Sequence, residues 1–295
     1  MDKHVNLQSS STQQSSLPSK PSVPPPDSGA DSAVLAVKAA GSSSLFLAAV
    51  VLYTFIALLD GIALFNHDVN SPFASVFMIL TESTRQSFAF TWKAQIDFTA
   101  LIIGIAEFVL VLLILSGLWL FFFSSKSRKN SVSTIGLTMI QTVVIIQIIG
   151  ICIIGLIGIM QLIMDAKKLL IAIGYIPGLS TIHTAGAVIA VILVFALFIL
   201  LLVYYIKITQ TITAVRETAQ IKIPYDQIST LIIVINCVSA ACSIFSGITT
   251  ILYGGSPRLF LSELLTAAFL IIISISVLQY RTRIRQLKTA SKPVV

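Results

Sequence analysis

Six long runs of apolar residues constrain the fold of this chain more than any other feature of its sequence. They cover residues 44–66, 97–123, 132–164, 182–206, 228–253 and 259–280. About 20 consecutive apolar residues cross a bilayer as an α-helix. A transmembrane β-barrel would instead need short strands of alternating polarity, and these runs are continuous. The sequence therefore predicts an all-α fold, a polytopic transmembrane bundle of about six helices.

The overall composition points to the same environment. Hydrophobic residues make up 56% of the chain and charged residues only 11%, whereas roughly 25% of the residues in a soluble domain are charged. In water such a chain would expose far more apolar surface than soluble proteins do. We therefore expect the lipid bilayer to be its main partner.

The two ends of the chain differ from the middle. Residues 1–43 are rich in Ser, Gln, Pro and Gly and contain no aromatic residue, which predicts a disordered cytoplasmic tail. The spacing of Pro18, Pro21 and Pro24 favours polyproline II, either as a ligand for a proline-binding domain or as a semi-stiff tether. Residues 281–295 are predicted to form a basic cytoplasmic tail.

The distribution of Lys and Arg predicts the orientation. Six spans place alternate connections on the same side of the membrane, and 14 of the 19 Lys and Arg residues fall on the side that carries both termini. The other side carries five. Cytoplasmic loops are enriched in these residues, so the short turn at 124–131 and both termini are predicted to be cytoplasmic.

Glu107 is the strongest candidate for a functional residue inside a span. An ionisable side chain is costly in lipid and is therefore a functional candidate. Ala100 and Gly104 precede it on the same helical face, and small residues mark close helix packing. Glu107 is thus expected to point into the bundle, either as a proton- or cation-binding group in transport or as a protonated, hydrogen-bonded structural residue.

The fifth span carries a second polar and small-residue stripe. Asn236 shares a helical face with three small residues, Ser239, Ser243 and Gly247, and an Asn in lipid seeks a hydrogen-bond partner on a neighbouring helix. Gln147 lies inside the third span. We expect most of these residues to hold helices together, and a polar pathway through Glu107, Gln147 and Asn236 is the sharper alternative.

Motifs of several enzyme classes are missing from the sequence. It contains no H-E-x-x-H zinc-protease motif, no phosphate-binding G-x-x-x-x-G-K-[ST] loop and no G-x-S-x-G nucleophile elbow. The three cysteines, Cys152, Cys237 and Cys242, lie inside predicted spans and read as small buried hydrophobic residues. We therefore expect no catalytic residue, cofactor, bound metal or nucleic acid.

Three stretches carry a resemblance to other proteins. They are LSGLWLFFFSSKSRKNSVSTIGLTMIQ (115–141), VYYIKITQTI (203–212) and LLTAAFLIIISISVLQYRTRI (264–284). In its pattern of apolar and basic stretches and in the placement of its loops, the chain resembles uncharacterised polytopic membrane proteins of Gram-positive bacteria. The resemblance implies a location in a bacterial cytoplasmic membrane and assigns a role to no residue.

Two classes of function fit these observations. The first is a non-enzymatic scaffold or sensor that contacts a cytoplasmic protein through the N-terminal tail or the loop 207–227. The second is a small solute or ion transporter, or a permease component, with a polar interior around Glu107. The few polar residues inside the spans favour the first class.

Overall fold

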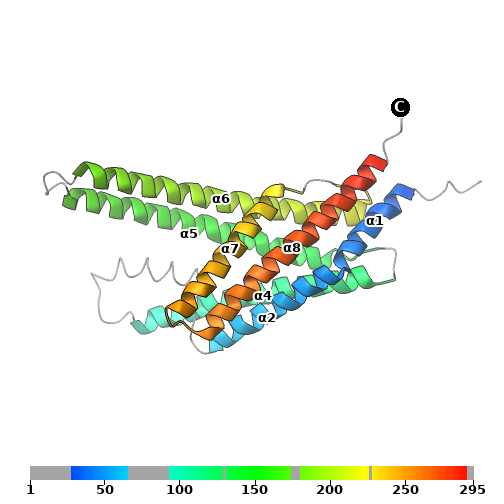
Figure 1. The fold of residues 1–295 in the computed structure, drawn as a ribbon, viewed down its shortest axis with the longest axis horizontal. Helices are drawn as coiled ribbons and strands as arrows, with labels where there is room; N and C mark the ends of the chain where they lie inside the picture. The colour runs from blue at the N-terminus through cyan, green and yellow to red at the C-terminus, as the bar shows by residue number, and fades with distance from the viewer. Residues whose placement is uncertain (1–27, 66–92, 129–130, 174–179, 226–227, 291–295) are drawn as a thin grey trace, which may run out of the picture.

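The computed structural model describes residues 28–65, 93–128, 131–173, 180–225 and 228–290. In these residues the chain is helical and contains no β-strand (Figure 1). The helices, in chain order, are α1 (Ser28–Gly41), α2 (Ser44–Phe65), α4 (Lys93–Lys126), α5 (Ile135–Ile173), α6 (Ser180–Ile221), α7 (Thr230–Leu252) and α8 (Pro257–Ala290). The all-α fold class is confirmed.

Six of the described helices, α2 and α4 to α8, are long and apolar enough to cross a membrane. Lipid offers no hydrogen-bond partner to the backbone, so a helix that satisfies its own N–H and C=O groups is the stable form of an apolar run. The helices fit an integral, multi-pass membrane protein. Each apolar run of the sequence overlaps one of these helices. Several of the helices, such as α6 and α8, continue beyond the end of the run.

Local signals in the sequence set several helix ends. The Ser229 hydroxyl accepts a hydrogen bond from the Leu231 N–H at 3.3 Å, as expected of a helix N-cap. At the other end of α7, Gly254 takes a positive φ of 72°, a conformation that glycine adopts at little cost. Pro257 then opens α8 in the first helical turn. Helices α7 and α8 therefore form a hairpin.

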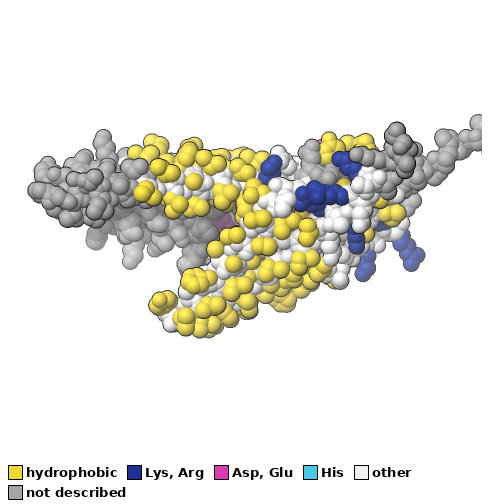
Figure 2. Space-filling view, turned by 45° about the horizontal axis from the view of Figure 1, so that its top comes forward, with side chains coloured by type: hydrophobic (Ala, Val, Ile, Leu, Met, Phe, Trp, Pro, Cys, Tyr) yellow, Lys and Arg dark blue, Asp and Glu magenta, His cyan; other side chains and the backbone are white. Residues whose placement is uncertain are grey.

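The helices separate into two groups that meet at one end. Helix α7 packs along α8, and α2 packs against α8 and α4, whereas α5 packs against α6 and α4. In Figure 1 the α5–α6 hairpin diverges from the other spanning helices toward the left. We call the end where the groups meet the basic end, because Lys126, Arg216 and Arg283 lie there and Lys and Arg side chains gather there in Figure 2.

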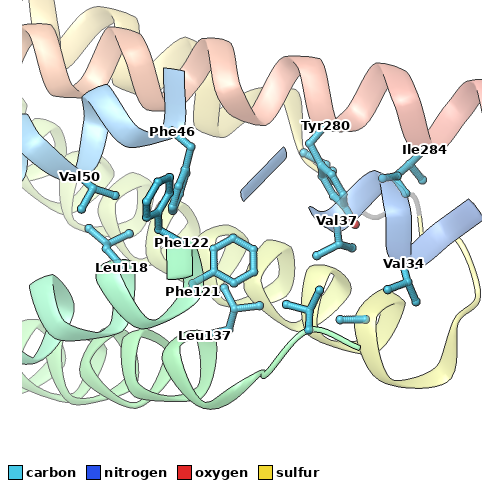
Figure 3. Close-up of a cluster of buried hydrophobic side chains, with 14 residues drawn as sticks. Val34, Val37, Phe46, Val50, Leu118, Phe121, Phe122, Leu137, Tyr280 and Ile284 are labelled. Carbon is cyan, nitrogen blue, oxygen red and sulfur yellow. The ribbon is translucent and has the colours of Figure 1, made fainter. Parts of the chain in front are cut away.

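The main hydrophobic core lies at the basic end (Figure 3). Helices α1, α2, α4, α5, α6 and α8 all contribute to it, as does Ile228 just before α7. Its labelled members in Figure 3 are Val34, Val37, Phe46, Val50, Leu118, Phe121, Phe122, Leu137, Tyr280 and Ile284. The rings of Phe46 and Phe121 meet edge to face, with centroids 5.5 Å apart. The basic end is therefore the part of the chain where the helices pack most completely.

Helix α1 corrects the prediction of a disordered segment over 1–43. Residues 28–41 are helical, and Ala33, Val34 and Val37 are buried against α4, α6 and α8. Burying these side chains removes apolar surface from water, which offsets the entropy of ordering the segment. The Lys38 ammonium also donates to the Ser127 carbonyl oxygen at 2.7 Å. Residues 1–27 lie outside the described residues.

The predicted basic tail at 281–295 is also partly helical, because α8 continues to Ala290. Ile284 in this extension is fully buried in the core. The Arg281 guanidinium donates to the Thr230 hydroxyl of α7 at 2.7 Å. This extension is therefore part of the packed bundle, and residues 291–295 lie outside the described residues.

Helices α4 and α5 cross at two glycines. A Cβ atom on Gly117 would lie 2.7 Å from the carbonyl oxygen of Gly136, and a Cβ on Gly136 would lie 2.8 Å from the Phe121 nitrogen. Real Cβ atoms almost never approach other atoms so closely, and here the neighbouring atoms belong to the backbone. The close approach of the two helices therefore depends on glycine at both positions.

Candidate functional site

A chain of hydrogen bonds joins three helices through Asn236. The Tyr204 hydroxyl of α6 donates to Asn236 Oδ1 at 2.5 Å, and Asn236 Nδ2 donates to the Ser274 hydroxyl of α8 at 3.0 Å. Ser274 in turn donates to the Leu270 carbonyl oxygen at 2.7 Å. Asn236 is 4% exposed, so these bonds satisfy a polar group that would be costly in an apolar interior.

The small-residue stripe of α7 faces α8. Asn236, Ala240 and Gly247 are buried, and Ser239 and Ser243 are half-buried. A Cβ on Gly247 would lie 3.3 Å from the Phe260 ring. Next to it, the Ser246 hydroxyl donates to Glu263 Oε1 at 3.3 Å. The positions chosen on α7 thus lie along its interface with α8, which is the most extensive helix interface among the described residues.

Glu107 is half-buried on α4, and its Oε1 atom is enclosed by protein. Gly104, one turn earlier, is buried. The side chain of Ala100 lies outside the described residues. Phe108 packs on Gly61 of α2, where a Cβ would come within 3.1 Å of the ring. This part of α4 therefore packs closely against α2.

The structure does not bring the three candidate polar residues together. Gln147 is half-buried on α5, which packs on α4, the helix that carries Glu107. In the described part of the chain, α7 has no contact with α4 or α5, so Asn236 lies apart from both. Its partners, Tyr204 and Ser274, come from α6 and α8 instead.

Tyr204 and Ser274 are the site residues that sequence reasoning missed. Tyr204 stands where an apolar run ends before Lys207, the position of an interfacial aromatic. Ser274 lies inside a mostly apolar stretch of the sixth span, IIISIS (271–276). A polar side chain inside a span was the available signal for Ser274, since such a group needs a partner on a neighbouring helix.

Further polar contacts join α5 and α6 near the basic end. The Arg216 guanidinium donates to Gln141 Oε1 at 2.9 Å, and Gln141 Nε2 donates to the Thr213 hydroxyl at 3.0 Å. One turn closer to the end, Gln220 Nε2 donates to the Thr134 hydroxyl at 3.0 Å. These bonds hold the base of the α5–α6 hairpin together.

The chemistry of these groups is that of helix association. An amide and a hydroxyl exchange hydrogen bonds without changing charge, and such interhelical bonds contribute about 0.6 to 2 kcal/mol in a membrane. Among the described residues, no three or more His, Cys, Asp or Glu side chains are grouped so that they could hold a metal ion.

Comparisons with protein-family models, with curated proteins and with solved structures found no match.

Proposed function

We propose that this protein is a non-enzymatic membrane scaffold or sensor that acts through its basic end. The proposed setting is a bacterial cytoplasmic membrane with the basic end in the cytoplasm, in line with the distribution of Lys and Arg and with the resemblance described above.

The position of the hydrophobic core carries this proposal. A transporter concentrates polar groups between its helices near the middle of the membrane. Here the most complete packing lies at one end, where α1 joins the ends of α4, α6 and α8. Lys126 and Arg283 are exposed beside this core. A well-packed base with exposed cations is suited to present a fixed surface to another molecule.

The transport alternative has less support. It requires a polar route through Glu107, Gln147 and Asn236, and Asn236 instead bonds to Tyr204 and Ser274 on helices that carry neither of the other two. Glu107 remains the residue that would test it. A solute or ion flux in liposomes that disappears in a folded Glu107→Gln variant would favour transport over the scaffold or sensor.

Site-specific photo-crosslinking tests the scaffold or sensor function. A photo-reactive residue at Arg283, next to the core, is expected to give a protein adduct of one defined mass in native membranes. The adduct should be lost when Arg285 is changed to Glu, because the reversed charge weakens electrostatic complementarity. The matched control is the same probe at Phe245, which is 70% exposed on the apolar surface of α7. Equal adducts at both positions, or none at Arg283, would contradict the proposal.

Cysteine labelling tests the proposed orientation. In a variant without the native cysteines, a membrane-impermeant maleimide added to intact cells is expected to modify Ser256→Cys, in the turn between α7 and α8. It should leave Ser127→Cys unmodified until the cells are opened, because Ser127 lies at the basic end beside Lys38. Modification of Ser127→Cys in intact cells would reverse the orientation.

A further inference from the structure

The α5–α6 hairpin is held to the rest of the bundle mainly near the basic end. There, α5 crosses α4 at Gly117 and Gly136, and α6 contacts α1 and α7. Away from the basic end the hairpin diverges from α7 and α8, as both Figure 1 and Figure 2 show. Its two helices still contact each other in this outer part, where the Phe198 ring packs directly on Gly155.

Side-chain exposure shows how little of the outer hairpin touches the other helices. Large apolar side chains are exposed at nearly successive positions of α6: Ile192, Leu193, Val194, Phe195, Leu197, Ile199, Leu200 and Leu201. With 3.6 residues per turn, these positions cover most of the circumference of the helix. By contrast, α8 buries Ala267 and Ser274 on one face and Ser276 on the opposite face. Among the described residues, the outer part of α6 therefore packs on α5 and lacks the contacts on two sides that fix α8.

The hydrogen bond from Tyr204 to Asn236 lies where the two groups of helices begin to separate. Packing between α6 and α7 is sparse, so this 2.5 Å bond is a large part of what joins them. Asn236 is itself fixed by the bond to Ser274 of α8. The bond therefore ties α6 to the α7–α8 pair. Hydrogen bonds between membrane helices are modest interactions that can be broken and remade.

We propose that the α5–α6 hairpin is a hinged arm that pivots at the basic end, and that the Tyr204–Asn236 hydrogen bond is the latch that sets its angle to α7. Motion of the arm would couple the position of the outer segments of α5 and α6 to the helix ends at the basic end. Such a hinge moves packed segments as rigid bodies about a small contact region. The proposal does not depend on whether the basic end binds a partner.

Distance measurements between spin labels test the latch. Nitroxide labels at Phe195→Cys on α6 and Phe245→Cys on α7 report the angle of the arm in lipid nanodiscs, in full-length protein whose native cysteines are replaced by Ala. With the Tyr204–Asn236 hydrogen bond intact, the distance between the two labels is expected to have one narrow distribution. Tyr204→Phe removes only the hydroxyl that donates to Asn236, and it should broaden the distribution and add a population absent from the latched protein.

Two controls separate a latch from general loosening of the fold. Tyr205→Phe removes the hydroxyl of the next, also half-buried, tyrosine and should leave the distribution unchanged. Labels at Ile248→Cys and Leu261→Cys, on α7 and α8, should give the same distance with and without Tyr204→Phe. An unchanged arm distance in Tyr204→Phe overturns the proposal. A change in the α7–α8 distance also overturns it, because the bond would then stabilise the whole bundle.

Discussion

Gly136→Val is expected to cause a large loss of stability. A Cβ at this position would meet the carbonyl oxygen of Gly117 and the Phe121 nitrogen, both backbone atoms of α4. A backbone cannot rotate away as a long side chain can, so α4 and α5 must move apart. Overpacking costs roughly 1 to 3 kcal/mol and occasionally more, and a clash with backbone atoms is expected at the upper end of that range. The measurement is thermal unfolding of the detergent-solubilised protein, followed by a size-exclusion profile.

Gly158→Val is the matched control for this substitution. Gly158 lies in the same helix, and in the described part of the chain a Cβ there would have no heavy atom within 4 Å other than those of its own helical turns. Both variants carry the same change of intrinsic helix propensity, so the difference between them isolates the helix crossing. Equal melting temperatures for the two variants would show that the α4–α5 approach at Gly117 and Gly136 is not required.

Val37→Asp is expected to separate α1 from the bundle. Val37 is fully buried in the basic-end core. The substitution loses the burial of a Val side chain, about 1.5 to 3 kcal/mol, and it places a carboxylate where the surrounding side chains are apolar. We expect faster proteolysis within residues 28–41 and a lower melting temperature. Limited proteolysis with mass spectrometry locates the cleavage.

Leu35→Asp provides the comparison within the same helix. Leu35 is 62% exposed, so the same new charge remains in contact with solvent. Its proteolysis rate should match that of the wild type. If both variants are cleaved at the same rate, the packing of α1 is not what protects the segment.

Local sequence was sufficient to predict the spanning helices and insufficient to predict α1. A continuous apolar run has one stable form in lipid, so each span could be recognised without its neighbours. Helix α1 is short, and its apolar residues, Ala33 to Val37, stand in a segment dominated by Ser, Pro and Gln. Its stability comes from side chains of α4, α6 and α8, which lie far away in the sequence. Composition averaged over 1–43 contains no information about those contacts.

The candidate site was likewise predicted only in part from the sequence. The need of Asn236 for a partner and the packing stripe that ends at Gly247 follow from the polarity and size of residues on one helix. Which partner Asn236 finds depends on the register of three helices. A tyrosine near the end of a span is typical of the membrane interface, so Tyr204 gave no sign that it reaches Asn236. The separation of α7 from α4 and α5, which keeps Asn236 away from Glu107 and Gln147, is a property of the assembled bundle.

The packing of α2 against α8 has a consequence for biosynthesis. A chain is made from its N-terminus at roughly 5 to 20 residues per second, so α2 enters the membrane roughly ten to forty seconds before α8 leaves the ribosome. During that interval α2 can pack on α4 but lacks the part of the mature core that α8 supplies, which includes Tyr280 and Ile284. The α5–α6 hairpin, whose helices contact each other, can meanwhile insert as a unit. Assembly of the basic end is therefore a late, post-insertion event that waits for α8.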